Sequence, residues 1–240
     1  YSELYDWSIQ NPELFWDNCA SFCGMTFSQP PTSIVSNIYQ MPGTKWFSGA
    51  TLNYAQHCLK STNATIHELN ESGHCRTLSS QELYELVSKW VRYFKDNGIK
   101  KGDRIAGILP NNITAIAAML GATSIGAVWS SCSPDFGLKG ICERLEQIQP
   151  ACIISISEYT YKGKPISIVD RLNMIKDSLS STKLWVLASD QPTTNWTLLA
   201  DIEAIEPSKI EFVNCAFDDP LFILFSSGTT GKPKCIVHSV

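Results

Sequence analysis

The sequence is short of histidine and has no excess of positive charge. Its 240 residues include 4 His, and its 19 Lys and Arg are outnumbered by 23 Asp and Glu, which gives a formal net charge of -4 at pH 7. A surface with this balance has no overall attraction for nucleic acid or for an anionic membrane. We therefore expect neither as a partner, and any anionic ligand must be held by local geometry.

Long hydrophobic runs are also scarce. The uncharged stretch from Ile105 to Pro134 is interrupted by Pro110-Asn111-Asn112, and its helical part is mostly Ala, Gly, Ser and Thr. A membrane-spanning helix needs roughly 20 mostly apolar residues, so a buried strand followed by a buried helix is the better interpretation. No charged segment followed by an apolar core opens the printed sequence, so we expect no secretory signal and a cytosolic protein. Because the chain begins at Tyr1 and stops at Val240 within a predicted strand, we expect it to be incomplete.

Cysteines lack the spacing of a metal site. The 9 Cys are irregularly placed, and Cys19 and Cys23 are followed by no second Cys/His pair at the spacing of zinc ligands. An odd number of cysteines in a chain of this size indicates reduced thiols. We expect no metal-binding residue in this segment.

Alternating strand and helix signals dominate the chain after its first sixty residues. Ser79 and Glu82 form a capping box that begins a helix with an apolar stripe, and Asn97-Gly98 ends it. Further strands are predicted at 104–109, 127–131, 151–157, 183–188, 221–225 and 235–240, and further helices at 113–126, 137–147 and 168–180. This order predicts an α/β fold whose mostly parallel sheet is flanked by helices and binds ligands at the carboxyl ends of its strands.

The first sixty residues are different, with many aromatic and turn-forming residues and no sustained periodicity. We expect a helix at 11–23, an extended arm whose aromatic side chains pack on a larger body, and a helical turn or two at 53–60. Residues 1–60 are therefore interpreted as a cap segment and 61–240 as a separate, incomplete domain.

The most informative segment is Phe225-Ser-Ser-Gly-Thr-Thr-Gly-Lys-Pro-Lys234, which follows a predicted buried strand. Its glycines permit backbone angles that let successive N–H groups converge on an anion, and its hydroxyls and lysines suit phosphate oxygens. It is not a Walker A loop, because Pro233 follows Gly231-Lys232 and a strand rather than a helix follows the segment. A plain surface turn is the alternative, and the order of ten such residues argues against it. We predict a phosphate site formed by Ser226, Ser227, Gly228, Thr229, Thr230, Gly231 and Lys234.

This segment resembles the signature phosphate loop of the adenylate-forming (AMP-binding) superfamily, which includes acyl-CoA synthetases, luciferases and peptide-synthetase adenylation domains. The resemblance implies that the loop grips the phosphates of ATP while a carboxylate attacks the α-phosphorus, after which the acyl group passes from the adenylate to a thiol. It implies that Thr229, Thr230 and Lys234 contact the outer phosphates and that the other four residues shape the loop. ATP, Mg²⁺ and CoA are the implied cofactors.

Other segments narrow the resemblance. Residues 46–55 are similar to the entry segment of acetyl- and acetoacetyl-CoA synthetases, and residues 126–137 resemble acetoacetyl-CoA synthetases in particular. The likeness implies a ligase of fatty acid metabolism that activates a short-chain acid, with acetoacetate as the leading candidate. Acetate and propionate stay open as substrates, and so does a truncated, non-catalytic nucleotide-binding or interaction module.

A second, weaker candidate site is Tyr161-Lys162-Gly163-Lys164. In related acetyl-CoA synthetases a basic, glycine-containing segment at the corresponding place touches the nucleotide end of CoA, which implies that role for Lys162 and Lys164. A solvated turn is the simpler interpretation. The resemblance places the adenine, Mg²⁺ and acyl pockets beyond Val240, so we expect no catalytic residue here and no activity from the segment alone.

Overall fold

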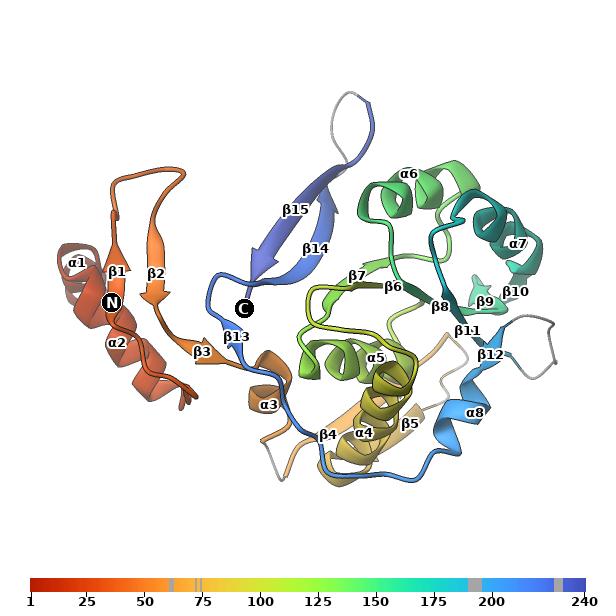
Figure 1. Ribbon diagram of the computed structural model, residues 1–240, viewed down its shortest axis with the longest axis horizontal. Helices are drawn as coiled ribbons and strands as arrows, with labels where there is room; N and C mark the ends of the chain where they lie inside the picture. Colours follow the sequence, from red (N-terminus) through yellow and green to blue (C-terminus); the bar gives the residue numbers. More distant parts are fainter. Residues whose placement is uncertain (61–62, 72, 74, 190–195, 227–230) are drawn as a thin grey trace.

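The computed structural model describes every residue except 61–62, 72, 74, 190–195 and 227–230. A seven-stranded sheet forms its centre (Figure 1). In sheet order the strands are β12 (Thr197–Leu198), β11 (Leu184–Ala188), β8 (Cys152–Ile156), β6 (Arg104–Ile108), β7 (Val128–Cys132), β14 (Pro220–Ser226) and β15 (Lys234–Ser239). All neighbours are parallel except β14 and β15. The predicted α/β fold with a mostly parallel sheet is confirmed.

Helices cover both faces of this sheet. On one face lie α4 (Ser80–Asp96) and α5 (Ile113–Ser124), with the short helices α3 (Tyr54–Cys58) and α8 (Leu199–Glu203) beside them, whereas α6 (Leu138–Ile148) and α7 (Val169–Ser178) cover the other (Figure 1). β8 is buried along its whole length and β6 along all but its first residue. This double coverage explains why their sequences are continuous apolar runs.

The predicted helix after Ser79 forms as expected. The Ser79 hydroxyl accepts from the backbone N–H of Glu82, and the Glu82 carboxylate accepts from the backbone N–H of Ser79 at 2.8 Å. The Ser79 hydroxyl also donates to this carboxylate at 2.7 Å, and the two bonds from the Ser79 N–H and hydroxyl hold the pKa of the Glu82 carboxyl below its usual value. At the other end Gly98 has φ +76°, the left-handed conformation that ends a helix.

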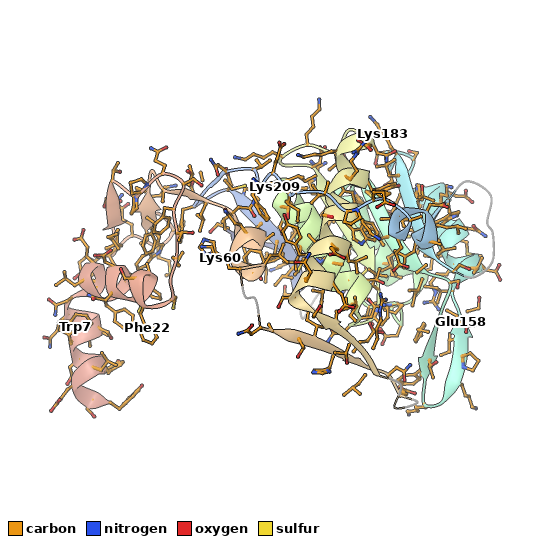
Figure 2. The ribbon with its side chains drawn as sticks, turned by 90° about the horizontal axis from the view of Figure 1, so that it is seen from below. Trp7, Phe22, Lys60, Glu158, Lys183 and Lys209 are labelled. Atoms are coloured by element: carbon orange, nitrogen blue, oxygen red, sulfur yellow. The ribbon has the colours of Figure 1, made fainter. Side chains whose placement is uncertain are left out.

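The amino-terminal residues form a small unit of their own. It contains α1 (Ser2–Gln10), α2 (Pro12–Phe22), a hairpin of β1 (Ser33–Ser36) and β2 (Lys45–Ser48), and β3 (Thr51–Leu52). Figures 1 and 2 show it beside the main body, with Trp7 and Phe22 far from the large sheet. The sequence predicted one helix and an extended arm; the additional helix and the hairpin were missed because both are short and their apolar pattern is irregular.

Aromatic side chains of this unit pack mainly on one another. The rings of Trp16 and Trp46 are 5.6 Å apart, and Phe47 lies 4.9 Å from Phe217, just before β14. The expected packing on a larger body is therefore wrong for Trp16 and Trp46, and it holds for Phe47 only through Phe217. Phe22 is 94% exposed.

Short hairpins that carry little sequence signal complete the fold. One hairpin is formed by β4 (Thr65–Leu69) and β5 (Cys75–Ser79), and another by β9 (Glu158–Tyr161) and β10 (Lys164–Ser167). In addition, the short strand β13 (Cys215–Ala216) pairs with β3. Within the described residues no helix is long and apolar enough to cross a membrane, and no group of three or more His, Cys, Asp and Glu side chains has the arrangement of a metal site.

Asn53 joins three separate parts of the chain. Its buried amide nitrogen donates to the carbonyls of Thr123 and Ser124 at 3.1 Å each and to that of Val213 at 2.8 Å. Its oxygen accepts from the backbone N–H of Gln56 at 3.0 Å, which starts α3. One side chain therefore fixes the amino-terminal segment, the end of α5 and the segment that returns towards β14.

Removing this amide is expected to destabilise the protein. Asn53→Leu removes the side-chain donor to three carbonyls and the acceptor of the Gln56 N–H, although the Thr123 and Ser124 carbonyls keep backbone donors. The free energy of unfolding should therefore fall by about 1–3 kcal/mol in urea denaturation. Asn18→Leu is the matched control, because within the described part of the chain the Asn18 amide hydrogen-bonds to the Leu14 carbonyl alone, on an exposed helix face. It should change stability by less than about 0.5 kcal/mol. Equal losses in the two variants would contradict the bridging role of Asn53.

Replacement by alanine should change the stability of the protein in opposite directions at two helical glycines. A Cβ at Gly121 of α5 would lie 2.6 Å from the Trp90 Cβ of α4, whereas a Cβ at Gly140 of α6 meets nothing closer than 3.5 Å. Gly121→Ala is expected to lower stability by about 1–3 kcal/mol through overpacking. Gly140→Ala should raise it by about 0.5–1 kcal/mol because alanine is the better helix former. Thermal unfolding of both variants tests the expectation, and stabilisation by Gly121→Ala would contradict it.

Candidate functional site

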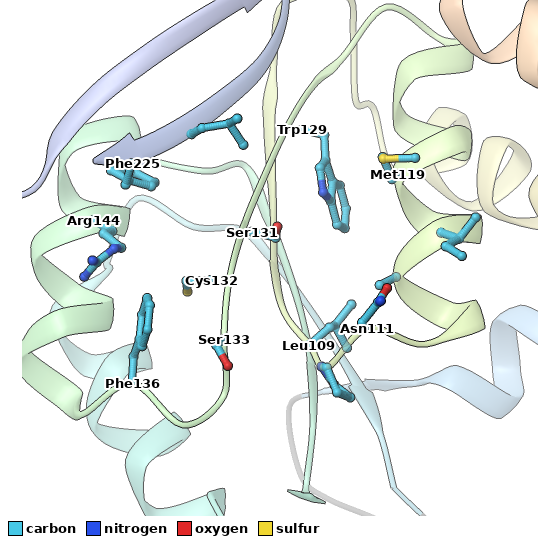
Figure 3. A pocket seen from close by; sticks show the side chains of 14 residues that line it. Leu109, Asn111, Met119, Trp129, Ser131, Cys132, Ser133, Phe136, Arg144 and Phe225 are labelled. Atoms are coloured by element: carbon cyan, nitrogen blue, oxygen red, sulfur yellow. The ribbon is translucent and has the colours of Figure 1, made fainter. Parts of the chain in front are cut away.

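A cavity of about 660 Å³ opens at the carboxyl ends of β6, β7 and β14 (Figure 3). It is lined by Leu109, Pro110, Asn111, Ala115, Ile116, Met119, Trp129, Ser131, Cys132, Ser133, Phe136, Arg144, Leu224 and Phe225. Leu224 directly precedes the predicted phosphate segment, and Phe225 is the first residue of that segment. The cavity and that segment therefore share one edge of the sheet, where the fold class led us to expect ligands.

The position of the cavity follows from the connections of β6 and β7. After β6 the chain enters α5 on one face and continues to β7; after β7 it enters α6 on the opposite face and returns past β6 to β8. The two loops leave neighbouring strands in opposite directions. The crevice between them is the topological switch point at which open α/β sheets bind ligands.

One wall of the cavity is apolar and tightly packed. Trp129 of β7 lies over Gly107 of β6, and a Cβ on Gly107 would come within 2.9 Å of the indole ring. The buried Ser130 hydroxyl donates to the carbonyl of Ile223 at 2.7 Å and ties β7 to β14. Glycine at position 107 and serine at position 130 therefore hold the Trp129 ring and the β14 backbone in place.

The opposite wall carries one cation. The half-buried Arg144 guanidinium lies 4.5 Å from the centre of the Phe136 ring and 5.8 Å from that of Phe225 (Figure 3). Its Nη1 donates to the Gly140 carbonyl at 2.6 Å, and among the described residues no carboxylate pairs with it. Among the lining residues it is the only charged side chain. Low polarity around a cation strengthens its attraction for an anion.

The Cys132 thiol faces the same cavity without nucleophilic character. Burial raises its pKa to about 12, and the nearby Arg144 charge offsets only part of that effect. The thiol therefore stays protonated near neutral pH, and a protonated thiol is a poor nucleophile.

The structure describes the two ends of the predicted phosphate segment. Ser226 ends β14 and pairs with Lys234 at the start of β15, and Gly231 has φ +106°, a conformation that favours glycine. Ser227, Gly228, Thr229 and Thr230 lie outside the described residues. The strand before the segment was predicted to be buried; Leu221 and Ile223 are, but Leu224 is 47% exposed, because β14 and β15 extend past the covered part of the sheet.

Lys162 and Lys164 lie in the tight β9–β10 hairpin, away from the residues that line the cavity. Lys162 and Gly163 have φ of +51° and +73° and form its turn, and Glu71 accepts from the Gly163 N–H at 2.8 Å. Lys162 Nζ lies 5.4 Å from the Tyr161 ring. Both lysines are exposed. A contact of either with CoA stays a prediction.

Sequence reasoning missed Met119, Trp129, Phe136 and Arg144 as site residues. For Phe136 a signal was present, because it lies in the loop between the predicted strand at 127–131 and the predicted helix at 137–147, and such loops lie at the carboxyl edge. The other three residues lie inside predicted helices or strands and carried no such signal. What the sequence does not give is the strand order, and only that order brings the residues after β6, β7 and β14 together.

Comparison with known proteins agrees with this architecture. The family model "AMP-binding enzyme" matches residues 55–240, and "Acetyl-coenzyme A synthetase N-terminus" matches residues 1–58. The chain is 37% identical to an acetoacetyl-CoA synthetase of Danio rerio and 36% identical to one of Rhizobium meliloti; each match covers 100% of the chain and 38% of the relative. It is 33% identical to the malonamoyl-CoA synthetase vrtB of Penicillium aethiopicum, over 99% of the chain and 36% of that protein.

Among solved structures, the acetoacetyl-CoA synthetase of Streptomyces lividans superposes with a TM-score of 0.93 at 30% identity, over 100% of the chain and 38% of that structure. The chain thus spans less than two fifths of the length of these relatives. The family model that matches residues 55–240 covers most of the sequence, including the cavity and the phosphate segment. The chain belongs to the AMP-binding enzyme family.

Proposed function

We propose that the protein carrying this chain uses ATP to activate a short-chain carboxylic acid and transfers the acyl group to CoA. Acetoacetate is the acid that we propose as the substrate. The observation that carries the proposal is the segment from Phe225 to Lys234, rich in glycine, hydroxyl and lysine side chains, which links β14 to β15 beside the cavity. The relatives named acetoacetyl-CoA synthetase support the choice of acid.

In the proposed reaction a carboxylate oxygen of the acid attacks the α-phosphorus of ATP and pyrophosphate leaves. The CoA thiolate then attacks the acyl carbon of the adenylate, and AMP leaves. Because the substrates supply both nucleophiles, the protein contributes positioning and charge stabilisation. Thr229, Thr230 and Lys234 would contact the outer phosphates, and Ser226, Ser227, Gly228 and Gly231 would shape the loop.

ATP, Mg²⁺ and CoA are the proposed co-substrates. Gly231 in its left-handed conformation and the exposed Lys234 suit a polyphosphate. Mg²⁺ is commonly held by the phosphates themselves with few protein ligands. We propose that the adenine, Mg²⁺ and acyl pockets lie beyond Val240, that residues 1–60 form a cap segment on an adenylation domain beginning near residue 61, and that the enzyme is cytosolic.

A different short acid is the second candidate. The relative from Penicillium aethiopicum is named a malonamoyl-CoA synthetase, so proteins similar to this chain differ in their acid. Since the proposed acyl pocket lies beyond Val240, the described residues do not discriminate among these acids.

Carboxylate-dependent ATP–pyrophosphate exchange by the full-length protein tests the proposal. Acetoacetate should support the fastest exchange beside acetate, propionate and butyrate. Lys234→Ala and Thr230→Ala should each lower kcat/KM by about 10²-fold, because each removes a phosphate contact made in the transition state. Lys209→Ala is the matched control, since that lysine is exposed and lies in the segment between α8 and β13.

The possible results separate the parts of the proposal. Faster exchange with another acid would keep the reaction and replace the substrate. Absence of exchange with every acid, from a folded full-length protein, would overturn the proposed function in favour of a non-catalytic binding module.

A further inference from the structure

The ribbon of β14 and β15 extends beyond the support of the sheet. β14 pairs with β7 only through Phe222 and Ile223, so its last residues, Leu224 to Ser226, have β15 as their one strand partner. All residues of β15 from Lys234 to Ser239 are exposed. Figure 1 shows the ribbon projecting next to α6. A phosphate segment at the end of such a ribbon needs another support if its position is to be fixed.

Helix α6 contacts the ribbon at both ends of the phosphate segment. At the first end, Arg144 lies over the ring of Phe225, the residue before Ser226. At the second end, the Gln147 amide nitrogen donates to the carbonyl of the buried Pro233 at 3.0 Å, and the Gln147 oxygen accepts from the Cys235 thiol at 3.5 Å. Residues three apart on a helix share one face, so one rigid surface touches both ends.

We propose that Gln147 and Arg144 are positioning residues that hold the two ends of the phosphate segment against α6. The inference rests on the proposed function in one respect, that residues 226–234 bind the phosphates of ATP. Reacting groups displaced by about 1 Å lose as much as 10²-fold in rate. Bracing both ends of a projecting ribbon from one helix limits that displacement.

The same helix connects the segment to the cavity wall. Arg144 stacks on Phe136 as well as on Phe225, and Arg171 of α7 donates to the carbonyls of Pro134 and Phe136 at 2.7 and 2.9 Å. Helix α7 therefore fixes the loop that follows β7. Arg144 contacts both this loop, through Phe136, and β14, through Phe225, so it links the position of β14 to that of the loop. Substitutions at Gln147 and Arg144 should consequently be coupled.

Kinetics of the full-length protein test the proposal. Gln147→Leu should raise the KM for ATP in pyrophosphate exchange about tenfold, the ratio expected for loss of one hydrogen bond. The KM for the acid and the Tm should stay unchanged, because Gln147 is exposed. Gln147→Lys keeps an N–H donor for Pro233 and should recover most of the affinity for ATP. If Gln147 only stabilised the fold, Gln147→Leu would lower Tm and would change the KM for ATP and the KM for the acid by the same factor.

Gln81→Leu is the matched control, because Gln81 is an exposed helical glutamine whose one side-chain hydrogen bond among the described residues goes to Glu85, also on α4. It should leave both KM values unchanged. Arg144→Met should raise the KM for ATP, and the double variant with Gln147→Leu should lose less than the sum of the two, since both act on one ribbon. An unchanged KM for ATP in Gln147→Leu, together with loss of exchange in Lys234→Ala, would overturn the brace and keep the proposed function.

Hydrogen exchange tests the brace without any substrate. Peptides that cover residues 231–239 should exchange several-fold faster in Gln147→Leu than in the wild type, whereas peptides from β6 and β8 should not change. This result would support the brace even if no acid promoted pyrophosphate exchange. Equal exchange of residues 231–239 in the two proteins would overturn the brace whatever the activity.

Discussion

Two successive crossovers that leave the sheet in opposite directions determine where this protein can bind a ligand. Right-handed connections put α5 on one face after β6 and α6 on the other after β7, so the loops between them part at the carboxyl edge. Trp129 then stands on one side of the opening and Arg144 on the other. The next strand in the sheet, β14, ends beside the same opening and leads into the phosphate segment.

The described residues that line this opening include one cation, Arg144, beside aromatic rings, aliphatic side chains and a few neutral polar groups. Arg144 rests on two phenylalanine rings without a described carboxylate partner, and burial keeps Cys132 protonated. Neutral and partly apolar surroundings make one positive charge more effective than it is in water. Such a site suits an anionic ligand that brings its own nucleophile, which is the situation in the proposed adenylation.

Support for β14 comes from two parts of the chain that are distant from it in sequence. Ahead of the strand, Cys215 and Ala216 pair with β3, Phe217 packs on Phe47, and Asn53 holds the segment at Val213. At its far end, Arg144 and Gln147 of α6 contact the ribbon. The amino-terminal unit and α6 thus fix the two ends of the strand that carries the phosphate segment, although neither lies near it in sequence.

The sequence by itself determined the class of the fold and the order of its main elements. Capping, apolar periodicity and the glycine stops act over a few residues, so Ser79, Glu82 and Gly98 located α4 correctly, and the buried runs located β6 and β8. The composition of residues 225–234 led to the prediction of a phosphate segment, which stays a prediction, because the chemistry on which it depends is local. Short hairpins such as β9–β10 were missed, because a few half-exposed residues carry no periodic signal. Only the tertiary structure decided the cavity, because the strand order places residues 109, 129, 144 and 225 together. That order depends on the packing of α5 and α6 on opposite faces of the sheet. The packing energy is shared among side chains that are distant in sequence, so no local sequence pattern records it.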